Sequence, residues 1–262
     1  MSDEARTASA RKVRRLSNGR VLTWWFEVLA VLAFYGLYSM IRNAIVGDDR
    51  VAFDNARALI SVQDALGFNV EETIQRWALR SKALIVSMNY VYGSLHFIVT
   101  AGVGIYLFRR WTDDYPRWRN TMALMTLLAL VFFWAWPLMP PRWLPEFSDV
   151  FNIGRYQYVD TLAKYPTLWS FNSATMSKIS NQYAAMPSLH CGWSLWCACA
   201  IVPRVTNRWV KLAFIAYPLL TLTAIVLTGN HFFLDAVGGW AVFGVAYAAV
   251  RLVSSRQLRP AL

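Results

Sequence analysis

Charged residues are scarce in this sequence of 262 residues. Asp, Glu, Lys and Arg together make up 16% of it and hydrophobic residues make up 56%, whereas soluble domains carry about 25% charged residues. A soluble globular domain is therefore excluded. Because a helix needs about 20 mostly apolar residues to cross a bilayer, we predict an all-α polytopic membrane protein, a bundle of six transmembrane helices. The six apolar segments are residues 21–46, 84–108, 120–139, 184–203, 209–228 and 231–252.

Cysteine is equally scarce. The three cysteines, Cys191, Cys197 and Cys199, all lie in the fourth predicted span. Two of them flank a single residue, and a helix cannot bridge such a pair with normal disulfide geometry. Their spacing also lacks a zinc pattern. We therefore interpret them as small packing residues and expect neither a metal nor a cofactor.

Internal repeats and low-complexity linkers are absent, so one domain accounts for most of the chain. We expect a disordered basic tail over residues 1–20, a single membrane domain over 21–253 and a second tail over 254–262. Two outer connections are long. In the first, 48–83, apolar residues recur at helical spacing and predict short amphipathic helices on the outer leaflet. The second, 140–183, is too long for a simple turn, and connections of that length are usually functional or disordered.

Basic residues are in excess, with a net charge of +11. They border the predicted spans and form no patch on a soluble fold, so we exclude nucleic-acid binding. Most of them fall on one side of the six spans, which predicts that both termini are cytoplasmic and that the protein is integral to the plasma membrane. The residues on that side are Arg6, Arg11, Lys12, Arg14, Arg15, Arg20, Arg109, Arg110, Arg117, Arg119, Arg204, Arg208, Lys211, Arg251, Arg256 and Arg259.

Two short polar motifs interrupt the apolar sequence, Pro187-Ser188-Leu189-His190 and His231-Phe232-Phe233-Leu234-Asp235. Ionisable residues within membrane segments are costly, so a function is the default explanation. His231 and Asp235 stand at i and i+4, on one helical face. The carboxylate can hold one ring nitrogen protonated and leave the other free to act as base or nucleophile. The Pro-Ser start before His190 is typical of a helix N-terminus, which attracts phosphate.

The order of the spans places these motifs at one depth. The third span ends outward at Pro140-Pro141-Arg142, the fourth begins there with Ser188 and His190, and the sixth begins there with His231 and Asp235. Five polar side chains from distant parts of the chain are therefore expected close to the outer membrane surface. This convergence predicts a phosphate-ester enzyme whose active site faces the extracytoplasmic side.

The first motif is similar to the Pro-Ser-Gly-His motif of the type 2 phosphatidic acid phosphatase superfamily. The second, His231-x-x-x-Asp235 followed by Gly238, resembles the final motif of that superfamily. Two features depart from the pattern: its Lys-x6-Arg-Pro first motif is not found, and Ile225 replaces the arginine usually found six residues before the last histidine. Gly238 and Gly239 are expected to allow close helix packing.

A branch of this superfamily is more similar still. Pro140-Pro141-Arg142-Trp143, and Asn89-Tyr90-x-Tyr92 with His96, resemble inositol phosphorylceramide synthases and related bacterial inositolphosphotransferase-like proteins. The resemblance covers the third to sixth spans well and the first hundred residues less distinctively.

The resemblance implies a role for each residue of the motifs. His231 would attack phosphorus and form a phosphohistidine, and Asp235 would hold its tautomer and stabilise the charged ring. His190 would protonate the leaving alcohol and then deprotonate the acceptor. Ser188 would hold phosphate oxygens, and Arg142 would stabilise charge on the transferred group. No metal is required in this scheme.

Further polar residues are candidates for headgroup binding. Asn89, Tyr92 and His96 occupy i, i+3 and i+7 of the second span, on one face, where interhelical hydrogen bonding is an equal alternative. Arg42, near the outer end of the first span, is either a phosphate ligand or a lipid anchor. The basic residues of the second outer connection are additional candidates: Arg155, Lys164 and Lys178.

The function that these features predict is cleavage of a lipid phosphoester at the outer leaflet. The substrate is expected to be a membrane phospholipid or a polyprenyl-phosphate type of lipid. The phospho-group passes either to an alcohol, such as a lipid or glycolipid, or to water, as in a plain lipid phosphate phosphatase. One alternative is a metal-dependent membrane hydrolase with His190, His231 and Asp235 as ligands, since three ligands and an open position suffice for zinc. Another is a non-catalytic lipid-binding scaffold.

Overall fold

The chain is described by a computed structural model that covers residues 13–17, 19, 21–45, 47–154, 156–166 and 183–257. Within these residues the fold is helical, apart from a hairpin of two short strands, β1 (Val13–Arg15) and β2 (Val21–Thr23), paired antiparallel with Val13 opposite Thr23. The tail expected to be disordered over 1–20 is therefore partly ordered. Backbone pairing with β2 holds β1, and the Ser17 N–H donates to Asp113 Oδ1 at 2.7 Å. These contacts are non-local, so the tail's composition did not indicate them.

Five helices of the described residues are long and apolar enough to cross a membrane. They correspond to five of the six predicted spans. One of them is continuous over Lys82–Arg110 and contains a π-helical turn, η1, in its middle. The elements concerned are α2 (Trp24–Ala44), α5 (Lys82–Tyr90), η1 (Val91–Leu95), α6 (His96–Arg110), α7 (Tyr115–Ala135), α12 (Arg208–Leu227) and α13 (Phe233–Gln257).

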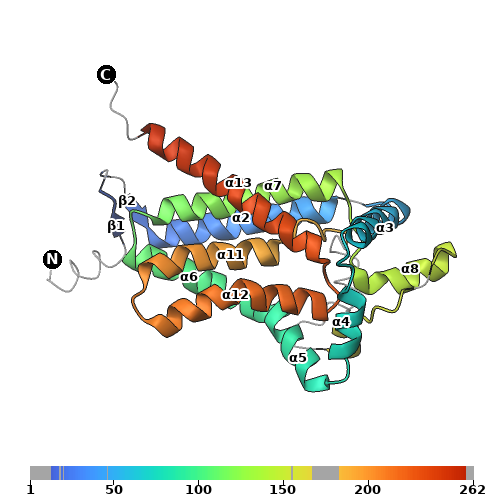
Figure 1. Cartoon of the computed structure of the whole chain (residues 1–262). Coiled ribbons are helices and arrows are strands. Elements are labelled where there is room, and N and C mark those ends of the chain that lie inside the picture. Colours follow the sequence, from blue (N-terminus) through green and yellow to red (C-terminus); the bar gives the residue numbers. More distant parts are fainter. Residues whose placement is uncertain are drawn as a thin grey trace.

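The remaining predicted span, 184–203, contains a shorter helix. Helix α11 runs over Leu189–Ile201, 13 residues, and is followed by a 3-10 turn, η3 (Val202–Arg204). At 1.5 Å per residue it is about 20 Å long, less than the roughly 30 Å of a hydrocarbon core. The residues before it do not form a helix: Ala184 pairs with Leu138 in a single bridge, and Pro187 disfavours helical geometry at the preceding residue. Helix α11 packs against α6, α7, α12 and α13, at the centre of the bundle (Figure 1).

Glycines bring α11 and α13 into close contact. A Cβ on Gly239 would lie 2.1 Å from the Ser188 carbonyl oxygen, and one on Gly192 would lie 3.1 Å from the Gly239 carbonyl oxygen. A Cβ on Gly238 would lie 3.4 Å from Pro187 Cβ. The expected close packing at Gly238 and Gly239 is confirmed. It places the start of α11 directly beside the first turns of α13.

Short helices cover one end of the bundle. Figure 1 shows α3, α4 and α8 at the end opposite to β1, β2 and the last turns of α13. Asp48 caps α3 by accepting from the Val51 N–H at 2.9 Å, and Phe53 of α3 packs with Leu138 and Leu144 beneath it. Amphipathic helices are therefore present in the first outer connection, as expected. The covering elements are α3 (Asp49–Ala65), α4 (Glu71–Ala78), η2 (Pro141–Trp143), α8 (Leu144–Phe151) and α9 (Thr161–Lys164).

Candidate active site

The turn between α12 and α13 presents His231. Gly229 ends α12 with a φ of 69°, a left-handed conformation that favours glycine. A Cβ at this position would lie 2.6 Å from Gln75 Nε2. The N–H groups of Asn230 and His231 both donate to the Ile225 carbonyl, at 3.0 and 3.3 Å. The turn thus fixes the backbone of His231 before α13 begins.

His231 and Asp235 form a buried pair. Their side chains are 7% and 0% exposed respectively. The His231 Nδ1 lies 3.2 Å from Asp235 Oδ2, and the Phe232 backbone N–H donates to the same oxygen at 2.9 Å. Because a carboxylate oxygen only accepts hydrogen bonds, it favours the tautomer with the proton on Nδ1. The Nε2 of His231 is then the nitrogen with a free lone pair.

Helix α11 brings Ser188 and His190 to the same place. Ser188 is the N-cap residue, with φ −70° and ψ 106°, and its N–H donates to the Asp235 carbonyl oxygen at 2.8 Å. Its Oγ is buried and has no hydrogen-bond partner among the described residues. His190 is partly exposed, and its ring centroid lies 5.7 Å from that of His231. The site therefore contains two neighbouring imidazoles and the N-terminus of a helix, which can bind phosphate.

His190 belongs to a column of stacked rings. Its ring centroid lies 4.3 Å from that of Tyr92 and 4.3 Å from that of His96, with interplanar angles of 20° and 29°. Trp193 continues the column, 5.0 Å from His96 and nearly parallel to it. The column fixes the plane of the His190 ring. Tyr92 and His96 both come from the helix that contains η1.

Arg142 lies beside the His231 turn. Its backbone N–H donates to the Gly229 carbonyl at 2.8 Å, and its guanidinium donates to Asn230 Oδ1. Its Nε lies 3.4 Å from Asp160 Oδ2. The side chain is 12% exposed. The guanidinium is therefore held by acceptors on two sides in a site that water reaches only in part.

Arg42 approaches from the last turn of α2. Its guanidinium lies 6.0 Å from the ring centroid of Tyr38 and donates to Asn43 Oδ1 at 3.3 and 3.4 Å. These contacts hold the Arg42 guanidinium at the end of α2, beside Tyr38.

Comparison with known proteins agrees with this geometry. A family model described as the PAP2 superfamily matches residues 57–249. The chain belongs to the PAP2 superfamily. The match includes both histidine motifs and Arg142, and membership implies a phosphatase or phosphotransferase type of activity, typically without a metal. No match was found among curated proteins or among solved structures.

Asn89 has its hydrogen bonds satisfied within this PAP2 protein. Its Nδ2 donates to the carbonyl oxygens of Thr161 and Tyr165 at 3.0 and 3.2 Å, and its Oδ1 accepts from the Thr161 hydroxyl at 2.8 Å. The residue is fully buried. It holds the second outer connection onto the bundle, so a headgroup could bind to it only after these bonds break.

His96 differs from Asn89. Neither of its ring nitrogens has a hydrogen-bond partner among the described residues, and it is 4% exposed. It contacts the cluster through the stack with His190. Of the remaining basic candidates, Lys164 is on α9 with its Nζ 5.7 Å from the Tyr165 ring centroid. Arg155 and Lys178 fall outside the described residues.

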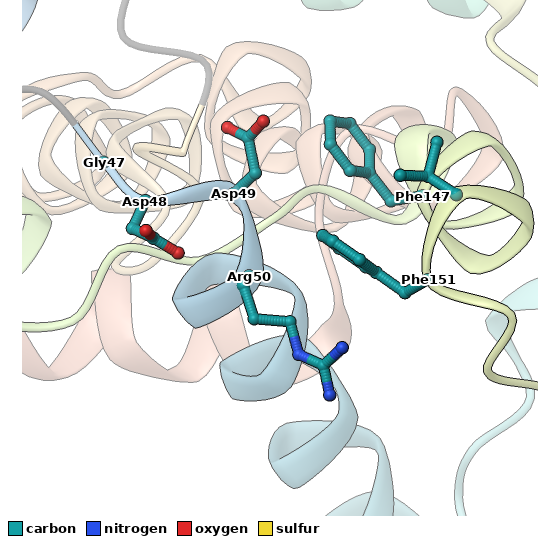
Figure 2. A pocket seen from close by; sticks show the side chains of 7 residues that line it. Gly47, Asp48, Asp49, Arg50, Phe147 and Phe151 are labelled. Carbon is teal, nitrogen blue, oxygen red and sulfur yellow. The ribbon is translucent and has the colours of Figure 1, made fainter.

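Two surface clefts lie away from the histidines. One, of about 370 Å³, is lined by Asp48, Asp49 and Arg50 from the start of α3 and its cap, with Phe147 and Phe151 of α8 opposite (Figure 2). The other, of about 410 Å³, lies between the ends of α2 and α7. Neither contains a histidine. In the part of the chain that the structure describes, His, Cys, Asp and Glu side chains form no group of three able to hold a metal.

Sequence reasoning did not identify the polar residues that support the site. Asn230 binds the Arg142 guanidinium, and Asp160 pairs with it. Gln63 and Glu71, fully buried in the covering helices, contact the start of α13. A signal exists only for Asn230, which is adjacent to His231. Asp160, Gln63 and Glu71 could not be recognised, because each bonds to a residue 18 to 171 positions away in the sequence.

Proposed function

We propose that this protein cleaves a lipid phosphoester through a phosphohistidine on His231 and transfers the phospho-group to an alcohol. The observation that carries the proposal is the meeting of two imidazoles, with ring centroids 5.7 Å apart, one of them paired with a buried carboxylate. PAP2 membership supports phosphorylated lipid-like substrates. The pair supplies a nucleophile and a separate acid, which phosphoryl transfer in two steps requires.

The first step uses both histidines. The Nε2 of His231 attacks phosphorus, the bond from phosphorus to the leaving alcohol oxygen breaks, and His190 donates its proton to that oxygen. In the second step His190 takes a proton from the acceptor hydroxyl, whose oxygen attacks phosphorus while the phosphorus–nitrogen bond breaks. Asp235 stabilises the positive charge that develops on the His231 ring. Both histidines are then restored to their starting states.

Charge on the transferred phosphoryl group is balanced by fixed donors. Arg142 is oriented by Asn230 and Asp160 before a substrate arrives, so little reorganisation is needed. The buried Ser188 hydroxyl and the first N–H groups of α11 are suited to phosphate oxygens.

The proposed orientation places this site at the extracytoplasmic face of the plasma membrane, with both termini in the cytoplasm. Placement of Lys and Arg in the sequence supports it, since 16 of the 26 fall on the side of the six predicted spans opposite to the histidine motifs. In this arrangement α11 is the sixth crossing segment. Its short length is tolerable because α6, α7, α12 and α13 surround it, so the non-helical residues before it are shielded from lipid.

Transfer to an alcohol is proposed in preference to hydrolysis. His231 is 6% exposed and Asp235 is fully buried, so a phosphohistidine formed here is partly shielded from water. The Pro140-Pro141-Arg142-Trp143 segment resembles the inositolphosphotransferase-like branch, which favours an inositol phosphate or a related phosphoalcohol as the transferred group. A plain lipid phosphate phosphatase is the second candidate.

The test uses the purified protein in lipid nanodiscs with phospholipids labelled on phosphorus and candidate alcohol acceptors. We expect a labelled product lipid and an acid-labile phosphohistidine on Nε2 of His231, both absent in His231→Ala. Free phosphate as the only product would exclude transfer to an alcohol and would show that the protein is a lipid phosphate phosphatase. Loss of activity after verified metal removal would favour the metal-dependent hydrolase, and normal physiological activity of His231→Ala would favour the scaffold.

A further inference from the structure

The first turn of α13 is capped by other helices. Phe232 donates its N–H to Asp235 Oδ2 at 2.9 Å, within the turn itself. The next two N–H groups are bound from outside: Phe233 donates to Glu71 Oε1 at 3.0 Å and Leu234 to Gln63 Oε1 at 3.4 Å. A helix begins with N–H groups that lack partners within the helix. Here α3 and α4 supply two of the partners.

Glu71 and Gln63 form one buried unit. Both are fully buried, Gln63 Nε2 donates to Glu71 Oε1, and Glu71 Oε2 accepts the N–H of Val70 at 3.0 Å. Glu71 contacts the backbone of Phe233, which is two residues after His231 in the chain. Holding a carboxylate away from water is costly unless it is fully hydrogen-bonded. A buried glutamate at this position therefore calls for a function.

The same face of α4 also contacts the segment that pairs with Arg142. Gln75, at i+4 from Glu71 and 1% exposed, binds both polar groups of the Val159 backbone: its Nε2 donates to the carbonyl at 2.9 Å and its Oε1 accepts the N–H at 2.9 Å. The residue after Val159 is Asp160, which pairs with Arg142. One turn of α4 thus contacts the helix of the nucleophile and the segment that holds the guanidinium.

We propose that Glu71 is a positioning residue, which fixes the first turn of α13 and thereby the direction of His231 Nε2 toward phosphorus. The inference rests on the proposed function. The role depends on the length of the Glu71 side chain, because the carboxylate must extend to the Phe233 N–H. Glu71 also binds the positive end of α13, which leaves the substrate phosphate to Arg142 and α11.

Two conservative variants separate reach from charge. Glu71→Asp keeps the charge but is one methylene shorter, so it withdraws from Phe233. Glu71→Gln keeps the length and an acceptor oxygen but loses the charge. We expect Glu71→Asp to lower kcat roughly tenfold to a hundredfold, because a misplacement of about 1 Å costs on this order, with KM changed less than about twofold. We expect Glu71→Gln to retain at least about a third of kcat. Glu146→Gln, at an exposed glutamate of α8, is the matched control.

Amide hydrogen exchange at Phe233 and Leu234 provides a readout that does not require turnover. Faster exchange in Glu71→Asp than in Glu71→Gln supports the cap even where the wild type transfers no phosphate, in which case only the proposed function fails. Wild-type kcat in folded Glu71→Asp overturns the inference, and so does an equal loss in both variants. A kcat that is normal per folded molecule, with less folded protein, would show a merely structural role.

Discussion

Substitution of Asp235 by Asn tests how the carboxylate assists His231. One oxygen, Oδ2, accepts from both the His231 ring and the Phe232 backbone N–H, at 3.2 and 2.9 Å. In Asp235→Asn the backbone N–H orients the amide with its oxygen in that position, since an amide nitrogen there would face a donor. The tautomer of His231 is then preserved, and only the negative charge is lost.

The expected loss follows from hydrogen-bond energies. A hydrogen bond to a charged group contributes about 1.5–3 kcal/mol and a neutral one about 0.5–1.5 kcal/mol. The difference is roughly 1–2 kcal/mol, which corresponds to about 5- to 30-fold in rate at 1.36 kcal/mol per tenfold. In Ser-His-Asp triads the same substitution costs about 10⁴-fold because the wrong tautomer forms. We expect a smaller loss for Asp235→Asn because the Phe232 N–H holds the amide oxygen toward His231 and so preserves the tautomer.

The assay measures single-turnover formation of the phosphohistidine and steady-state kcat for wild type, Asp235→Asn and Asp235→Ala. Asp235→Ala, which removes the acceptor altogether, is expected to lose about 10³- to 10⁴-fold. Asp149→Asn, on the exposed side of α8, controls for a change of charge. If folded Asp235→Asn is as inactive as Asp235→Ala, the argument that Phe232 orients the amide is wrong.

The remaining predictions concern the acid, the phosphate ligand and the helix contact. His190→Ala should lose about 10²- to 10⁴-fold with a lipid alcohol as leaving group but far less with a nitrophenyl ester, whose leaving group needs no proton; equal losses with both would contradict the acid role. Arg142→Lys, which loses the planar fork, should lower kcat/KM roughly 10²-fold, and an unchanged value would remove Arg142 from the site. Gly239→Ala, whose Cβ would lie 2.1 Å from the Ser188 carbonyl, should destabilise the protein by at least about 1–3 kcal/mol in thermal unfolding. Gly244→Ala, with nothing within 4 Å, should change little.

That these residues lie together was predictable from local spacing and from the order of the predicted spans. The i, i+4 relation of His231 and Asp235 fixes a contact within one turn, whatever surrounds it. Apolar runs mark where the predicted spans end, so His190 and Arg142 could be assigned to the same end of the bundle without knowledge of their neighbours. Two glycines in the motif region likewise indicated a close helix contact, and the structure confirms it.

Other features depend on contacts between distant residues, which periodicity does not report. The apolar residues of 184–188 suggested a long span, but Ala184 forms a bridge with Leu138 and helix α11 begins only at Leu189. Asn89 lies on the face expected for a headgroup ligand, yet it binds Thr161, 72 positions later. Glu71 looked like one of several charges on an amphipathic helix, and only its burial distinguishes it.

Two parts of the molecule set two different properties of the site. The spacing of the imidazoles depends on the backbone contact between α11 and α13, where Gly239 lies against Ser188 and no side chain intervenes. The first turn of α13 and the Arg142 guanidinium depend on side chains outside the bundle, since Glu71 contacts α13 and Gln75 holds the segment that continues to Asp160. The bundle itself supplies the stacked rings that orient His190, but few partners for a helix N-terminus or a guanidinium. The covering helices supply these partners, which explains why the elaborated connections of this chain lie at the end of the bundle that contains the histidines.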